Sequence, residues 1–111
     1  MEDKIKKIRE RFESLKLKMS DPKLLKDPNA LVSLGKEYKQ LAPIVASASR
    51  YAEAKASLRS AQDFLVQEKD EDLRTLAKEE IELKKQELAK AGKDIKRKLL
   101  GSEPEDVKSA K

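Results

Sequence analysis

The stretch from Ser20 to Val45, SDPKLLKDPNALVSLGKEYKQLAPIV, decides the fold. It contains two Asp-Pro steps, Asp21-Pro22 and Asp27-Pro28. The first step ends a helix, because the residue before a proline is pushed out of the helical region. The second step begins a helix, since Asp accepts hydrogen bonds from the first free backbone N–H groups and Pro fits the first helical position. The stretch therefore separates a short N-terminal helix from a long second helix.

Apolar residues recur every three or four positions along most of the chain, a pattern typical of helices that pack along a shared seam. The pattern predicts helices over residues 3–19, 28–68 and 73–100. The fold class is therefore all-α, with a short N-terminal helix packed on a long antiparallel hairpin in a three-helix, coiled-coil-like bundle. The predicted core seam consists of Ile5, Ile8, Phe12, Leu15, Leu31, Leu34, Tyr38, Leu41, Leu58, Leu65, Ile81, Leu88 and Ile95.

Three local features mark where these helices bend or end. Pro43 lies inside the second helix, where it removes a backbone hydrogen bond, so we expect a kink there rather than two separate helices. Residues 67–72, QEKDED, hold no apolar side chain, and Asp70 or Asp72 can cap the third helix. Gly101 is expected to close that helix in a left-handed conformation. Residues 101–111 are predicted to form a linker, or a cut end leading toward an absent catalytic domain.

The large apolar side chains are assigned to packing rather than to ligand binding. The four aromatic residues fall on or near the seams, and core packing explains them better than stacking on a ligand. Leu73 and Leu76 are likewise expected on the apolar face of the third helix. The aromatic residues are Phe12, Tyr38, Tyr51 and Phe64.

The composition fits an elongated helical domain. Charged residues make up 42% of the 111 residues and aromatic residues only 4%, so most side chains must lie on solvated helix faces. The 26 basic residues exceed the 21 acidic ones by five, which permits contact with RNA or with an acidic protein. We find no signal-peptide pattern and no apolar run that could span a bilayer, and therefore expect a soluble, cytoplasmic protein without a membrane partner.

The residues that usually carry catalysis are missing. The sequence has no His and no Cys, and its three glycines, at positions 35, 92 and 101, form no phosphate-binding loop. Glu79, Glu80 and Glu82 fall on different faces of one helix and do not converge as an acid–base pair would. We therefore predict that the chain is not an enzyme and that it has no cofactor, metal site or small-molecule ligand.

Two basic clusters are the candidate contact sites. Lys93, Lys96, Arg97 and Lys98 lie near the end of the third helix, where they can either complement the helix dipole or contact nucleic acid or a partner protein. No aromatic residue stands beside them to stack on bases. The second cluster, on the first helix, is interrupted by acidic residues and consists of Lys4, Lys6, Lys7, Arg9 and Arg11.

A series of short motifs runs along the chain in an order and at a spacing that resemble the N-terminal helical domain of bacterial class I peptide chain release factors, of the type that reads UAG and UAA. Each motif is weak alone, and their colinearity over nearly the whole chain carries the resemblance. Where family members usually have a Pro and an Asp, this chain has Gly101-Ser102-Glu103. The matching residues are Ser20-Asp21-Pro22, Asp27-Pro28, Lys36-Glu37-Tyr38, Leu41, Pro43-Ile44-Val45, Asp72-Leu73, Leu76-Ala77, Glu79-Glu80, Leu99-Leu100, Pro104, Asp106 and Lys108.

The resemblance implies a domain that takes part in translation termination without doing the chemistry. The family's Gly-Gly-Gln hydrolysis loop and its codon-reading tripeptide lie in later domains, and neither motif occurs in this sequence. The implied partners are the factor-binding side of the ribosome near the stalk base, the methyltransferase that modifies the catalytic Gln, and the companion GTPase release factor.

Two other functions remain compatible with the residues alone. The chain could be a structural coiled-coil module that acts by self-association, or a helical RNA-binding arm of a synthetase-like protein. A concentration-independent monomer argues against the first function. RNA binding that does not weaken with salt argues against the second, because each neutralised phosphate releases counterions.

Overall fold

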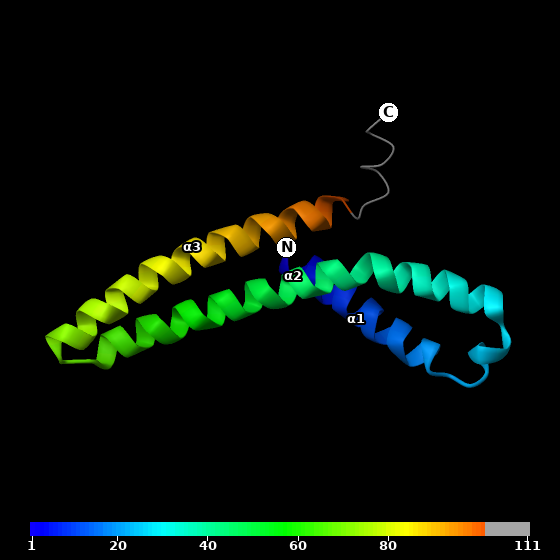
Figure 1. Cartoon of the computed structure of the whole chain (residues 1–111), viewed down its shortest axis with the longest axis horizontal. Helices are drawn as coiled ribbons and strands as arrows, with labels where there is room; N and C mark the ends of the chain where they lie inside the picture. Colours follow the sequence, from blue (N-terminus) through cyan, green and yellow to red (C-terminus); the bar gives the residue numbers. More distant parts are fainter. Residues whose placement is uncertain (102–111) are drawn as a thin grey trace, which may run out of the picture. The chain divides into compact units, whose positions relative to one another are not determined.

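The computed structural model describes residues 1–101, which form three α-helices and one short 3-10 helix, with no strand in this part of the chain (Figure 1). The elements are α1 (Glu2–Met19), η1 (Leu24–Lys26), α2 (Pro28–Gln67) and α3 (Glu71–Gly101). The all-α fold class is therefore confirmed. The predicted linker lies outside the described residues except for Gly101. The chain divides into two compact units: residues 1–46 with the end of α3 from Lys98, and residues 47–97.

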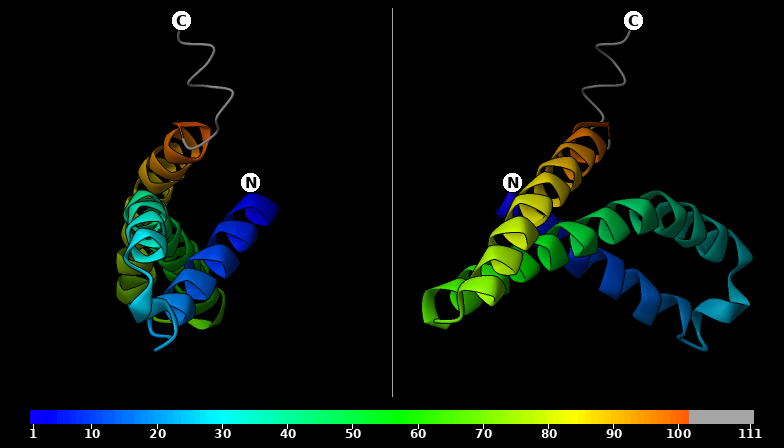
Figure 2. Two further views of the ribbon diagram at one scale, coloured as in Figure 1. Left: turned by 90° about the vertical axis from the view of Figure 1, so that its right-hand side faces the viewer. Right: turned by 60° about the vertical axis from the view of Figure 1, so that its left-hand side comes forward.

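In the first unit, α1 and the first part of α2 run antiparallel and are joined through η1 (Figure 2). The rings of Phe12 and Tyr38 stack between these helices, with centroids 4.7 Å apart and an interplanar angle of 21°. Leu15 is completely buried, and Ile5 is 7% exposed. The other predicted seam residues of this unit are half-buried: Ile8, Phe12, Leu31, Leu34, Tyr38 and Leu41.

The start of α2 has the local structure that its sequence predicts. Asp27 is extended, with φ −119° and ψ 90°, and its Oδ1 accepts a hydrogen bond of 3.2 Å from the backbone N–H of Ala30. This bond satisfies one of the free N–H groups of the first turn. The helix then continues through Pro43 to Gln67, so the alternative of two separate helices is wrong, while the kink stays a prediction.

In the second unit, the later part of α2 and α3 run antiparallel as a hairpin (Figure 1). Ile95 is completely buried and Ile81 is 8% exposed, while the seam residues Leu58, Leu65 and Leu88 are half-buried. The rest of the buried interface is made of small side chains, which allow two helices to approach closely. These buried residues are Ser47, Ala48, Ala54 and Ala77.

Asp70 determines where α3 begins. Its Oδ1 accepts hydrogen bonds from the backbone N–H groups of Asp72 (2.9 Å) and Leu73 (3.2 Å). Because Asp70 is the cap, the helix starts at Glu71, two residues before the position predicted from the apolar pattern. At the other end, Gly101 is the last helical residue, and no glycine among residues 1–101 has a positive φ. The expectation of a left-handed cap at Gly101 is therefore wrong.

The expectation that Phe64 packs in the core near the hairpin turn is also wrong. Phe64 is 48% exposed, and on α3 Leu73 and Leu76 are 42% and 60% exposed. The unit contains only two helices here, so a side chain on the flank of their contact keeps one side open to solvent. Periodicity correctly places these residues toward the apolar side of each helix but says nothing about whether a third element covers them.

Arg74 holds the turn of the hairpin closed. Its Nη1 donates hydrogen bonds of 2.6 and 2.8 Å to the backbone carbonyl oxygens of Leu65 and Glu68 at the end of α2. Carbonyl groups at the end of a helix lack a backbone N–H partner within the helix, so hydrogen bonds from a charged donor stabilise this end. We expect Arg74→Met to lower the free energy of unfolding by about 1.5 kcal/mol, measured by urea denaturation. Arg59→Met, an exposed change on α2, is the control, and equal losses in both variants would contradict this role.

A bidentate ion pair joins α1 to α2 in the first unit. Arg11 donates from Nε (2.6 Å) and Nη2 (2.7 Å) to the two carboxylate oxygens of Glu37. This hydrogen bonding lowers the pKa of Glu37 below its ordinary value of 4.5, against the opposing effect of burial. Since the folded state then binds its proton more weakly than the unfolded state, the stabilisation is fully present above about pH 4.5 and is lost as the pH falls through the folded value.

The pH dependence of Glu37→Gln tests this pair. We expect the difference in Tm between the native chain and Glu37→Gln to be largest near neutral pH and to shrink as the pH falls below about 4.5. Glu10→Gln, an exposed change on α1, serves as the control and should show a smaller, flatter difference. A difference for Glu37→Gln that stays constant from pH 7 to pH 3 would contradict the assignment.

Candidate functional site: a polar network and the basic end of α3

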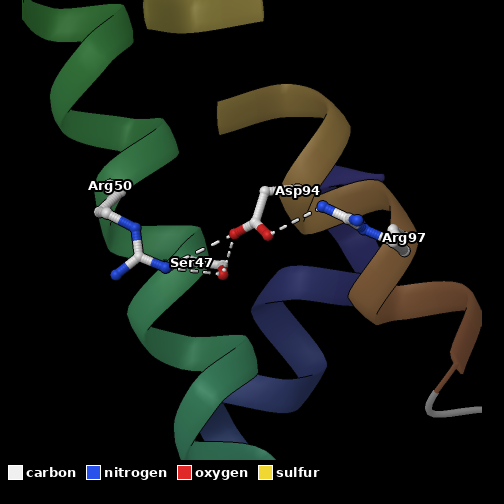
Figure 3. A network of polar contacts seen from close by, with 4 residues as sticks. All are labelled: Ser47, Arg50, Asp94 and Arg97. Carbon is white, nitrogen blue, oxygen red and sulfur yellow. Dashed lines mark hydrogen bonds and ion pairs between the residues drawn. The ribbon is translucent and has the colours of Figure 1, made fainter. Parts of the chain in front are cut away.

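A network of four polar side chains joins α2 to α3 in the second unit (Figure 3). Ser47 is 1% exposed, and its Oγ donates to Asp94 Oδ2 at 2.5 Å. Arg50 Nη2 donates to Ser47 Oγ at 3.1 Å and lies 3.5 Å from Asp94 Oδ2. Arg97 Nη2 lies 3.4 Å from the other oxygen, Asp94 Oδ1. The Asp94 carboxylate therefore receives donors on both of its oxygens.

This arrangement is suited to fixing the helices in place rather than to catalysis. A general base needs an oxygen within reach of a substrate proton, whereas both oxygens of Asp94 already face donors from the chain itself. Hydrogen bonds to a partly buried carboxylate are strong and directional. The network therefore sets the register between α2 and α3.

An open groove of about 620 Å³ lies beside the network, within the same unit. Three cationic and three anionic side chains line it, so it presents no net charge to a phosphate or to a metal ion. Lys84 lies 3.4 Å from Glu87 and 3.5 Å from Glu80, and these hydrogen bonds and charges raise its pKa. The charged lining residues are Arg50, Lys84, Lys90, Glu53, Glu87 and Asp94.

The predicted contact residues at the end of α3 do not all share one setting. Lys93, Lys96 and Arg97 are exposed and belong to the second unit, whereas Lys98 is half-buried and belongs to the first. Arg97 keeps 78% of its side chain exposed while it pairs with Asp94. Helical spacing places Lys90 one turn before Lys93 on the same face. We refer to the exposed residues Lys90, Lys93, Lys96 and Arg97 as the basic face.

The remaining charged residues singled out from the sequence form local pairs. Glu80 lies 3.5 Å from Lys84 and Glu82 lies 4.0 Å from Lys85, which agrees with solvated helix faces. On α1, Arg11 pairs with Glu37, and the other basic residues of that cluster are exposed. Within residues 1–101, no three His, Cys, Asp or Glu side chains come together in a way that could hold a metal ion.

Comparison with known proteins identifies the family. The model of the PCRF domain matches residues 8–111. The chain belongs to the PCRF domain family. The motifs quoted above lie within the matched residues, and the resemblance to peptide chain release factors is confirmed.

Curated relatives of this PCRF domain are bacterial proteins named peptide chain release factor 1. The protein from Agathobacter rectalis is 35% identical over 109 residues, which is 98% of this chain and 30% of the relative. The protein from Amoebophilus asiaticus is 36% identical over 98% of this chain and 31% of its own length. The protein from Bacteroides fragilis is 34% identical over 90% of this chain and 27% of its own length.

The chain therefore spans about a third or less of the relatives it matches. No solved structure matches the PCRF domain described here. No helix in residues 1–101 is both long enough and apolar enough to cross a membrane.

The polar network was not predicted from the sequence. Ser47 and Asp94 are 47 residues apart and neither belongs to a recognisable motif, so only the pairing of the two helices brings them together. Lys90 was also not predicted. Helical spacing alone places it on the same face as Lys93, so the sequence did contain the signal.

Proposed function

We propose that this PCRF domain is the non-catalytic docking domain of a peptide chain release factor that terminates translation at UAG and UAA codons in the cytoplasm. The observation that carries the proposal is the colinear similarity over 98% of the chain to proteins named peptide chain release factor 1. The absence of His, Cys and a Gly-Gly-Gln motif from the sequence supports the non-catalytic role. Peptide hydrolysis and codon reading then belong to other regions of the whole protein.

The proposed partner is the factor-binding side of the ribosome near the stalk base. The basic face supports this assignment, because four cations on one exposed stretch of α3 provide a sequence-independent attraction to phosphate. The ion pair with Asp94 limits the conformations of the Arg97 side chain before it contacts a phosphate. The release-factor glutamine methyltransferase and the companion GTPase release factor are proposed as further partners through the family resemblance alone.

Ribosome binding at different salt concentrations tests the role of the basic face. We expect the triple variant Lys90→Glu, Lys93→Glu, Lys96→Glu, which leaves the polar network intact, to lose most of the affinity of the chain for ribosomes in a pelleting assay. The slope of log K against log salt should fall by between about two and three, since each lost phosphate contact removes roughly 0.7–0.9 from it.

A matched control carries the same change in net charge on the first unit. Lys23→Glu, Lys26→Glu, Lys39→Glu alters three exposed lysines and should leave both affinity and slope close to the native values. An equal loss in both triple variants would show that only net charge matters and would remove the basic face from the proposal.

A further inference from the structure

An apolar groove lies near the turn of the hairpin in the second unit, apart from the polar network. It has a volume of about 320 Å³ and is lined by Ala61 and Phe64 of α2 and by Leu73, Leu76, Ala77 and Glu80 of α3. Phe64, Leu73 and Leu76 are 48%, 42% and 60% exposed. We call this feature the tip groove.

The gathering of these side chains is what distinguishes the tip groove from ordinary exposed apolar residues. Single exposed leucines are normal on a protein surface. Here three large apolar side chains from two helices line one hollow, whereas apolar residues scattered singly over a surface need no explanation. Neither the basic face nor the polar network uses any of them.

The charge around the tip groove is opposite to that of the chain as a whole. Residues 63–80 contain seven acidic and three basic side chains, an excess of four negative charges, whereas the whole chain has a net charge of +5. One of the three cations, Arg74, is engaged with the backbone carbonyls of Leu65 and Glu68. The surroundings of the groove therefore repel nucleic acid and attract a basic segment. The same region of a second copy of the chain would carry the same negative charge and would be repelled.

The acidic residues are distributed so that they can frame a ligand in the groove. Glu80 lies in the lining itself. By helical spacing, Asp72 stands one turn before Leu76 on α3. Glu68 directly follows the end of α2, and its carboxylate accepts hydrogen bonds from the backbone N–H groups of Lys69 and Asp70. A segment with apolar residues at its centre and cations on its flanks would match this pattern of an apolar floor and acidic edges.

We propose that the tip groove docks a basic amphipathic helix of a partner protein. Apolar side chains spaced three or four residues apart on that helix would enter beside Phe64 and Leu76, and its Lys or Arg residues would face Glu80 and its acidic neighbours. This is the helix-in-groove mode of recognition. The proposal does not depend on ribosome binding by the basic face, since it concerns other residues and the opposite charge.

A fluorescent peptide titration tests the proposal with the full chain. The probe is a synthetic amphipathic helix of about 18 residues, or five turns, with Leu on one face and Lys on the others. We expect it to bind, and we expect Leu76→Gln and Phe64→Gln to weaken binding by about tenfold each. Both sites are exposed, so helix content and Tm by circular dichroism should stay close to native.

Three controls separate this proposal from its alternatives. Val66→Gln removes an apolar side chain that is 81% exposed near the same turn but does not line the groove, and it should change binding by less than about twofold. The double variant Asp72→Asn, Glu80→Gln should weaken binding of the Lys peptide. A peptide with Glu in place of Lys should not bind.

Any of three results would overturn the proposal. The first is no binding of the Lys peptide at concentrations up to about 100 μM. The second is equal weakening by Val66→Gln and Leu76→Gln, which would indicate nonspecific adhesion. The third is a concentration-dependent dimer in sedimentation that Leu76→Gln abolishes, which would assign the groove to a second copy of the chain.

Discussion

Ile95→Ala is expected to lower the free energy of unfolding by about 3 kcal/mol. Ile95 is one of the few side chains with no solvent exposure, and it lies in α3 next to Asp94 of the polar network. Its truncation removes buried methyl and methylene groups and leaves a cavity in the core. The better helix propensity of Ala offsets only about 0.5 kcal/mol of this loss.

Urea denaturation followed by circular dichroism measures this effect. The midpoint should fall while the slope m stays constant, because the surface exposed on unfolding hardly changes. Leu83→Ala is the control, since Leu83 is 55% exposed on the same helix, and it should cost less than about 0.5 kcal/mol. A loss below about 1 kcal/mol for Ile95→Ala would mean that the packing of α3 is wrong.

Asp94→Ala is expected to cost about 2 kcal/mol. The substitution removes the acceptor that Ser47 Oγ and the two arginines share, and Ser47 is almost completely buried. Removing one partner of a buried hydrogen bond costs more than removing both, because the remaining group loses its acceptor without regaining water. The loss should therefore depend on whether Ser47 is present.

A double-mutant cycle with Ser47→Ala makes this test quantitative. The double variant Ser47→Ala, Asp94→Ala should cost at least about 1 kcal/mol less than the sum of the two single variants. Asp94→Asn keeps an acceptor for Ser47 and should cost less than Asp94→Ala. If the single losses simply add, Ser47 and Asp94 do not interact and the register of the hairpin rests on other contacts.

Local signals in the sequence predicted the helix boundaries well. Asp27 caps α2 through Ala30, and Asp70 caps α3 through Asp72 and Leu73, because both caps depend on residues within a few positions of each other. The apolar period also identified Leu15 and Ile95, which the structure buries completely. These features are encoded within single helical turns.

Features that depend on the pairing of distant residues could not be predicted. The hydrogen bonds from Ser47 to Asp94 and from Arg74 to the carbonyl of Leu65 form only when α2 and α3 pair in the correct register. The exposure of Leu76 has the same origin, since a periodic pattern shows which way a side chain faces but not whether another element lies there. Those residues carry the network, the turn and the tip groove.

The family resemblance and the residue chemistry answer different questions. Colinear motifs such as Lys36-Glu37-Tyr38 correctly indicated the PCRF domain, although Glu37 and Tyr38 are explained structurally by their contacts with Arg11 and Phe12. The basic face was defined from charge, exposure and helical spacing. Its role in docking is therefore tested by the ribosome-binding assay described above and does not follow from family membership.

A peptide-release assay with a grafted protein tests the central claim most directly. This chain would replace the corresponding region of the Agathobacter rectalis peptide chain release factor 1, and release of a labelled peptide would be measured on ribosomes stopped at UAG, UAA or UGA. A parallel graft would use a release factor of the other class I type. The chain alone and the relative without its corresponding region serve as controls.

The proposal predicts that the first graft releases peptide at UAG and UAA at a rate within about tenfold of the intact relative, a difference of about 1.4 kcal/mol in activation free energy. The parallel graft should be slower relative to its own parent, and the chain alone should release nothing. A first graft no faster than the relative that lacks this region, or release by the chain alone, would contradict the account.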